Sequence, residues 1–280
     1  FKRPKRWYFC KTKMKSIYFI AVNYNNAAYS IQYVESILAM KGNQNRKIII
    51  VDNKSNAADV RFLEERIKKH AEVTLIKNDT NAGYFRGLNA GLKTINPKDA
   101  DFVFIGNNDL TFEPEFIQNL YQQNYSDQTF AIAPDVVTAN GFHQNPLCTK
   151  RMHPLRKWGL RLYYTNYFFS KTIYHLTQVI KKATIPNKKL LTPSYIYMGI
   201  GACYILTPHF FKAYKLLRED VFLWSEEALF AGQITEAGGK TWYCPDLIVH
   251  HAENTSIKHI PSRLTYRMAR ESFLKTFRYY

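Results

Sequence analysis

The sequence has few cysteines and no long apolar run. Its four cysteines are scattered, with no C-x-x-C pair among them, which disfavours both a structural zinc site and a disulfide-stabilised domain. No stretch of about 18 apolar residues is present, so the sequence predicts no membrane-spanning helix. The basic N-terminal residues lack the apolar core of a secretory signal. We therefore expect a cytoplasmic protein.

Acidic residues are missing from two segments, and these segments carry the whole net charge. The 280 residues include 39 lysines and arginines against 22 acidic residues, a net charge of +17. Residues 1–15 hold seven basic residues and residues 150–189 hold ten, without an acid in either. The rest of the chain is therefore neutral. A hydrophobic fraction of 46% is typical of a globular protein and disfavours a disordered chain.

Apolar runs and amphipathic patterns alternate from residue 17 onward. Runs of apolar residues predict strands, and apolar residues at helical spacing predict helices between them. The predicted strands cover residues 17–25, 46–53, 73–79, 101–109 and 129–137. The predicted helices cover residues 27–40, 58–72, 83–95 and 113–123. This order predicts an α/β fold with a doubly wound, mainly parallel sheet covered by helices on both faces.

The regular pattern stops at residues 140–195, which are basic, aromatic and weakly periodic. It then resumes with a predicted strand, two helices, a strand–turn–strand segment and a closing amphipathic helix. These elements cover residues 199–207, 208–217, 226–239, 240–251 and 261–280.

Polar residues end several predicted strands, where parallel sheets bind ligands. Asp52 could accept a hydrogen bond from a nucleotide base, or could begin the next helix. Asn81 and Gly83 stand where a helix start favours phosphate, although this glycine pattern is weak evidence. Asn108 and Asp109, in GNNDLTF, offer oxygen ligands to a divalent cation or simply form a turn.

Two further pairs of residues could carry chemistry. Glu226 and Glu227 begin a predicted helix within an apolar stretch. Apolar surroundings raise a carboxyl pKa, as a general base requires, although acids are also common at helix starts. His250 and His251 end the last predicted strand and are either metal ligands or structural residues.

The chain carries a series of motifs in this order: VNYNN, VDNKSN, NAGYFRGLNAG, FIGNNDLTF, GIGACYIL, LWSEEALF and YCPDLIVHH, followed by a YRMAR helix. This series resembles the family 2 glycosyltransferases of the GT-A fold. The nearest likeness is to bacterial rhamnosyltransferase-like members. It implies a GT-A-type sheet with a helical, basic acceptor-side insertion. The implied divisions are a basic N-terminal segment (1–15), a nucleotide-sugar-binding half (16–139), a basic aromatic insertion (140–195) and an acceptor-binding half with a C-terminal helix (196–280).

The resemblance also implies which residues bind the donor and a metal. The implied donor-binding residues are Asn23, Asp52, Asn81, Gly83, Asn108 and Asp109. Asp52 would bind a pyrimidine base, and Asp109 would hold the diphosphate together with Mg²⁺ or Mn²⁺. His250, which matches the family pattern better than His251, would complete the metal site.

The acceptor-side acids of the family match Glu226 and Glu227. The second acid is the expected general base, which favours Glu227. The family has Asp at that position, and the extra methylene of Glu227 moves the carboxylate. The choice between Glu226 and Glu227 therefore stays open.

The implied reaction is inverting transfer of a sugar from a UDP- or dTDP-sugar to a hydroxyl of a glycan or lipid-diphosphate-linked acceptor, in bacterial cell-surface polysaccharide synthesis. The cations and aromatics of residues 150–189 suit an anionic membrane surface, at the inner face of the plasma membrane, and equally suit a solvated basic subdomain. Two alternatives are a nucleotide-sugar-binding protein without efficient turnover and a basic nucleic-acid-binding protein. No nucleic-acid recognition motif supports the latter.

Overall fold

A computed structural model describes residues 15–173, 189–253 and 262–280. Most of the basic segment 1–15, and residues 174–188 of the insertion 140–195, lie outside the described residues. The sequence-based expectations for those parts therefore stay predictions.

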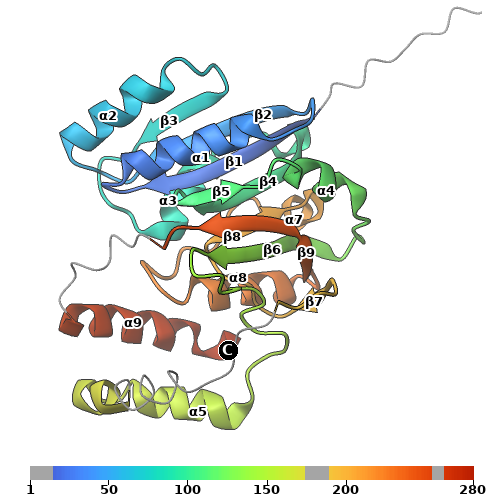
Figure 1. Cartoon of the computed structure of the whole chain (residues 1–280). Coiled ribbons are helices and arrows are strands. Elements are labelled where there is room, and N and C mark those ends of the chain that lie inside the picture. Colours follow the sequence, from blue (N-terminus) through green and yellow to red (C-terminus); the bar gives the residue numbers. More distant parts are fainter. Residues whose placement is uncertain (1–14, 174–188, 254–261) are drawn as a thin grey trace, which may run out of the picture.

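One mixed sheet forms the centre of the described part of the chain (Figure 1). Its strand order is β3–β2–β1–β4–β8–β6–β9–β5, with β7 paired to β9. The strands are β1 (Ser16–Asn23), β2 (Asn45–Asp52), β3 (Val73–Lys77), β4 (Ala100–Asn107), β5 (Leu110–Phe112), β6 (Thr129–Thr138), β7 (Ser194–Ile196), β8 (Cys203–Leu206) and β9 (Lys240–His251).

The long pairings in this sheet are parallel. β1 pairs in parallel with β2 and β4, β2 with β3, and β6 with β9. The short strand β8 lies antiparallel between β4 and β6 and joins the two parallel parts. The predicted α/β class with a mainly parallel sheet is therefore confirmed.

Helices cover both faces of this sheet. The α-helices are α1 (Ala27–Ala39), α2 (Ala57–Ile67), α3 (Tyr84–Leu92), α4 (Phe116–Gln122), α5 (Pro154–Tyr163), α7 (Pro208–Ala213), α8 (Glu226–Glu236) and α9 (Ser262–Thr276). The 3₁₀ turns are η1 (Pro97–Asp99) and η3 (Phe277–Tyr279). Residues 167–173 are also helical.

Alternate residues of the central strands face two different hydrophobic cores, as the period of a strand requires. Phe19 of β1 packs in the core beneath α1 and α4, where Phe104 stacks on it at 4.3 Å between ring centroids. Its neighbour Ile20 faces the opposite core, beneath α3 and α8. Strands buried on both faces read as continuous apolar runs, which explains why these strands were predictable.

Residues 240–251 differ from the predicted strand, turn and second strand, because they form one strand, β9. Its pairing with β6 jumps from Pro134–Cys244 to Asp135–Ile248. The three residues between, which include Pro245, bulge out of the ladder, since proline cannot donate a ladder hydrogen bond. The predicted turn is thus a bulge inside a continuous strand.

Helices α9 and α5 lie beyond α8, at the end of the molecule away from α2 (Figure 1). They are joined by the Tyr266 hydroxyl and the Arg270 guanidinium, which donate to the Tyr164 carbonyl at 2.9 and 2.8 Å. Within the ranges that the structure describes, no helix has the length and apolarity needed to cross a bilayer.

A pair of helical glycines tests the close packing of α3 on the sheet. A Cβ added to Gly91 would lie 2.5 Å from a methyl carbon of Ile20, whereas one added to Gly159 of α5 meets no atom within 4 Å. Gly91→Ala should therefore destabilise the protein by roughly 1–3 kcal/mol through overpacking. Gly159→Ala should be neutral or stabilising by up to about 1 kcal/mol. Thermal unfolding followed by circular dichroism measures both, and equal melting temperatures for the two variants would contradict this packing.

Candidate functional site

The side chain of Asn23 joins the polar ends of several elements. It is fully buried at the end of β1. Its Nδ2 donates to Asp52 Oδ1 and to Asp59 Oδ2, both at 2.9 Å. Its Oδ1 accepts from the Ser30 hydroxyl at 3.0 Å and from Asn108 Nδ2 at 3.1 Å. One amide therefore fixes the ends of β1 and β2 and the loop after β4 relative to α1 and α2.

This network involves two residues of the predicted donor site. Asn23 and Asn108 were expected to bind the donor, but both side chains are buried. Asn108 Nδ2 also donates to the Ser30 hydroxyl at 2.8 Å. Their amides are engaged inside the protein and hold the site in shape, and their expected contact with the donor stays a prediction.

Asp52 lies beside Asn23 at the end of β2, in register with it. Its carboxylate accepts the bond from Asn23 and a second from the Ser55 backbone N–H at 3.0 Å. It does not begin helix α2, because the side chain of Asn56 accepts from the Asp59 N–H there. A carboxylate has about four acceptor positions, so Asp52 keeps capacity for a further donor.

Asn53, a residue for which the sequence suggested no role, shapes the loop after β3. Its Nδ2 donates to Asn81 Oδ1 at 3.1 Å and to the Gly83 carbonyl at 3.0 Å. Its Oδ1 accepts from Asn78 Nδ2 at 3.0 Å and from the Ala82 N–H at 3.3 Å. The exposed Asn81 and the buried Gly83 are thereby held beside the end of β2.

Gly83 is required where this loop meets the segment before α8. Its φ of +91° disfavours any side chain. A Cβ there would lie 2.4 Å from the Phe222 carbonyl oxygen. The same oxygen accepts a hydrogen bond from the Tyr84 N–H at 3.1 Å. The loop before α3 therefore touches the loop that leads to the paired acids.

Two strained residues present the paired acids. Trp224 and Ser225 are both left-handed, with φ of 65° and 64°, a conformation that costs roughly 1–2 kcal/mol per residue. Contacts from the C-terminal segment hold this turn in place. Ser272 donates to the Leu223 carbonyl at 2.7 Å, and the Tyr280 hydroxyl bonds Ser225 Oγ at 2.9 Å. Such strain is often found at functional sites.

Glu226 and Glu227 begin α8 in a poorly hydrated environment. Burial, and then the charge of Glu227, raise the pKa of Glu226 to about 8. Within the described ranges, Glu226 Oε1 has no hydrogen-bond partner. Burial also raises the pKa of Glu227, but its Oε1 accepts from the Gly201 N–H at 3.2 Å. That bond favours the charged form of Glu227, and the charge of Glu227 in turn favours the protonated form of Glu226.

Tyr84 and residues 201–202 link Glu227 to the end of β4. The Tyr84 hydroxyl donates to the Gly201 carbonyl at 2.8 Å, and the Gly201 N–H donates to Glu227. The carbonyl of Ala202 accepts from the Asn107 N–H, at the end of β4, at 2.9 Å. Burial raises the pKa of the Tyr84 phenol. The segment before β8 therefore contacts both the acids of α8 and the strand that leads to the predicted metal residue.

The histidine beside Asp109 is His251. Its Nε2 lies 3.3 Å from Asp109 Oδ1 and 3.3 Å from Asn107 Nδ2. His250, which the sequence favoured, is half exposed and pairs with Glu113 at 2.6 Å. Successive residues of a strand point to opposite faces, so only one of the two histidines can face Asp109. The structure thus places His251 beside Asp109, and the expectation that His250 completes a metal site stays a prediction.

A short chain of hydrogen bonds fixes the protonation of His251. Gln144 Nε2 faces Glu253 Oε1 at 2.9 Å, so the amide oxygen of Gln144 faces His251 Nδ1, at 2.7 Å. The Glu253 carboxylate can only accept, so Nδ1 must carry the imidazole proton. In the neutral imidazole, Nε2 then carries the lone pair and faces Asn107 and Asp109. This is the tautomer that a metal ligand needs.

The donor set around Asp109 fits a divalent cation that is shared with a ligand. Asp109, His250 and His251 line a cavity of about 170 Å³. Among residues 15–173, 189–253 and 262–280, no group of three or more His, Cys, Asp or Glu side chains could hold a metal. The carboxylate and imidazole supply two ligands, which leaves the other positions for phosphate oxygens and water.

Comparison with known proteins agrees with this architecture. A family model described as Glycosyl transferase family 2 matches residues 18–184. No curated protein matches the chain in sequence.

Several solved structures share the fold. TarS 1–349 of S. aureus aligns with a TM-score of 0.56 and 13% identity, over 85% of this chain and 60% of its own. GalNAc-T7 with UDP, GalNAc and Mn²⁺ gives a TM-score of 0.61 at 15% identity, over 88% of this chain and 45% of its own. The mannosyltransferase PcManGT of Pyrobaculum calidifontis, in complex with GDP-Man and Mn²⁺, gives a TM-score of 0.58 at 14% identity, over 95% of this chain and 65% of its own. The chain thus spans less than two thirds of each, and the likeness extends to the GT-A fold.

The pKa of Glu226 predicts how stability changes with pH. The folded protein holds a proton on Glu226 up to about pH 8, whereas an unfolded chain loses it near pH ~4.3. The folded state therefore binds more protons between these values, and this contribution to stability is lost as the pH rises through about 8.

Glu226→Gln removes that loss. Its melting temperature should exceed that of the unmodified protein by at least about 3 °C near pH ~8.5, equivalent to roughly 1 kcal/mol, and by less near pH ~5. Glu65→Gln, at an exposed position of α2, serves as the control and should show no such difference. If Glu226→Gln changed the melting temperature by the same amount at both pH values, the raised pKa of Glu226 would be ruled out.

Proposed function

Because this chain belongs to glycosyl transferase family 2, we propose that it is an inverting glycosyltransferase that uses a nucleoside diphosphate sugar. The observation that carries the proposal is the contact of residues 201–202 with both Glu227 and the end of β4, the strand that leads to Asp109. A diphosphate site and a base for the acceptor must lie on either side of one anomeric carbon. The likeness to the rhamnosyltransferase-like branch stays a prediction.

The donor is proposed to lie across the carboxyl ends of β2, β1 and β4. Asp52 ends β2 and Asp109 follows β4, with β1 between them. Two strand spacings separate their backbones by roughly 10 Å, a span that suits a base at one end and a diphosphate at the other. The free acceptor capacity of Asp52 suits the N3–H of uracil or thymine, hence a UDP- or dTDP-sugar. The loop with Asn81 and Gly83 would line the donor site.

A Mg²⁺ or Mn²⁺ ion is proposed to bind at Asp109 and His251. GalNAc-T7 and PcManGT were solved with Mn²⁺, which supports a divalent ion here. When bound, such an ion would neutralise charge on the leaving diphosphate. Gln144 and Glu253 act as positioning residues, since they keep the His251 Nε2 lone pair available.

Glu227 is proposed as the general base. Its carboxylate takes the proton of the acceptor hydroxyl, whose oxygen attacks the anomeric carbon and forms the new glycosidic bond. The bond from that carbon to the diphosphate oxygen breaks on the opposite face, and the nucleoside diphosphate leaves. Glu226, which keeps its proton, leaves Glu227 the charged member of the pair. Buried surroundings strengthen the base, because they disfavour its charged form.

The acceptor is proposed to be a glycan or a lipid-diphosphate-linked sugar, in bacterial cell-surface polysaccharide synthesis. The site would then work in the cytoplasm, at the inner face of the plasma membrane. The sequence resemblance and the basic segment 150–189 support this assignment. The nucleic-acid alternative gains no support from the site.

Removing the base tests the reaction. Glu227→Gln should lower kcat for nucleoside diphosphate release by about 10²–10⁴-fold, the typical contribution of a general base, while the Kd for the donor changes little. The assay is release of UDP or dTDP from a panel of nucleotide sugars with Mn²⁺, together with calorimetric donor binding. Unchanged kcat would reject Glu227 as the base. Donor binding without release by the unmodified protein would favour a binding protein without turnover.

Comparing the two histidines tests the metal site. His251→Ala should weaken Mn²⁺-dependent binding of UDP by about 10–100-fold, as loss of a ligand or its support does at other metal sites. His250→Ala removes an exposed imidazole that pairs with Glu113 and should leave this binding unchanged. Calorimetric titration of UDP with and without Mn²⁺ measures both. A loss confined to His250→Ala would reverse the assignment.

A further inference from the structure

Helix α5 leaves an apolar stripe exposed to solvent. None of its residues is buried. Leu155, Trp158 and Leu162 are 76%, 55% and 59% exposed, and their spacing of three and four residues puts them on one face of the helix. Phe168 and Phe169, in the helical residues 167–173, are also more than half exposed. Large apolar side chains gathered in this way normally mark a docking surface.

Cations flank this stripe, and acids are missing around it in the sequence. Arg156 and Arg161 of α5 are exposed, as are Lys150 before the helix and Lys171 after it. No acidic residue occurs between Asp135 and Glu219. A face of this kind is complementary to a surface that is apolar inside and negatively charged outside.

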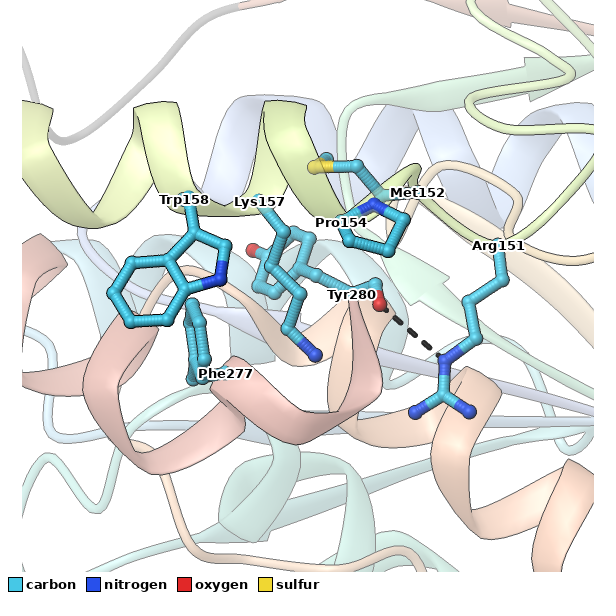
Figure 2. Close-up of a pocket in the computed structure, with 7 residues that line it drawn as sticks. All are labelled: Arg151, Met152, Pro154, Lys157, Trp158, Phe277 and Tyr280. Atoms are coloured by element: carbon cyan, nitrogen blue, oxygen red, sulfur yellow. Dashed lines mark hydrogen bonds between the residues drawn. The ribbon is translucent and has the colours of Figure 1, made fainter.

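A groove beside α5 has the same mixed character. It has a volume of about 460 Å³ and lies between α5 and η3 (Figure 2). Trp158 belongs both to its lining and to the exposed stripe. Lys157 Nζ lies 4.5 Å from the centroid of the Phe277 ring in this groove. Arg151 and Lys157 both line this groove, so their two positive charges would favour an anion there.

Among the described residues, α5 contacts the rest of the protein through one side. Its contacts run through the inward side, where Lys157 and Arg161 lie over Phe277. Arg151 donates to the Arg278 and Tyr280 carbonyls just before the helix. The helix is therefore fixed by one side, with Trp158 at the edge of the groove, while Leu155 and Leu162 stay exposed.

From this arrangement we infer that the exposed face of α5 docks on an anionic lipid bilayer. Trp158, Leu155 and Leu162 enter the headgroup region, where amphipathic aromatics and apolar side chains are favoured. Arg156 meets lipid phosphates, an attraction that salt weakens. A nucleic acid would contact the cations, but it offers no apolar region for the side chain of Leu155, which is 76% exposed. Docking does not depend on sugar transfer, so binding alone can test it.

The test is sedimentation of the full chain with vesicles of phosphatidylcholine and phosphatidylglycerol, compared with phosphatidylcholine alone. The protein should pellet with the anionic vesicles and be released by salt. Leu155→Ser combined with Leu162→Ser should lower vesicle affinity at least about tenfold, since two side chains lose their apolar burial. Arg156→Glu should lower it at least about fivefold.

Matched controls lie on α2. Phe62 is 41% exposed with Arg66 over its ring at 5.4 Å, so Phe62→Ser and Arg66→Glu make the same chemical changes elsewhere and should leave binding unchanged. Equal binding to phosphatidylcholine alone, or equal losses for the α2 controls, would overturn the inference. So would a dimer in sedimentation velocity that the α5 variants dissociate, because the stripe would then be a contact between two copies.

Discussion

The buried amide of Asn23 is the constraint on which the site depends. It satisfies carboxylates from β2 and α2 through its nitrogen, and a hydroxyl and an amide from α1 and the β4 loop through its oxygen. An amide is the side chain that can donate and accept in this way. Each partner is buried or nearly so, and an unsatisfied buried polar group costs roughly 1–3 kcal/mol. The positions of Asp52 and of the loop that bears Asp109 are therefore coupled through a single side chain.

Much of the fold could be predicted because its information is local. The buried strands are continuous apolar runs, and polar residues end each of them, which indicated both a mainly parallel sheet and the edge where ligands bind. The order of the motifs also predicts that Asp109, Glu226 and Glu227 serve one site, and this stays a prediction. The bulge at residues 245–247 could not be predicted, because Pro245 in a turn and Pro245 in a bulge give the same local pattern.

The parts of the site that could not be predicted depend on pairing and on hydrogen-bond partners. Which histidine faces Asp109 is set by the register of β9 against β5, and a shift of one residue exchanges His250 for His251. Asn23 and Asn108 have the chemistry of ligand-binding residues, but only the fold shows that other side chains use their amides. Asn53 resembled any polar strand end, although it shapes the loop that holds Gly83.

The contact between Gly83 and Phe222 ties two loops of the site together. The Phe222 carbonyl, on the loop that ends in the left-handed Trp224 and Ser225, accepts a hydrogen bond from the first N–H of α3. A shift of one loop alone would break that bond, at a cost of about 1 kcal/mol. The two loops therefore keep their relative position most easily when they move together.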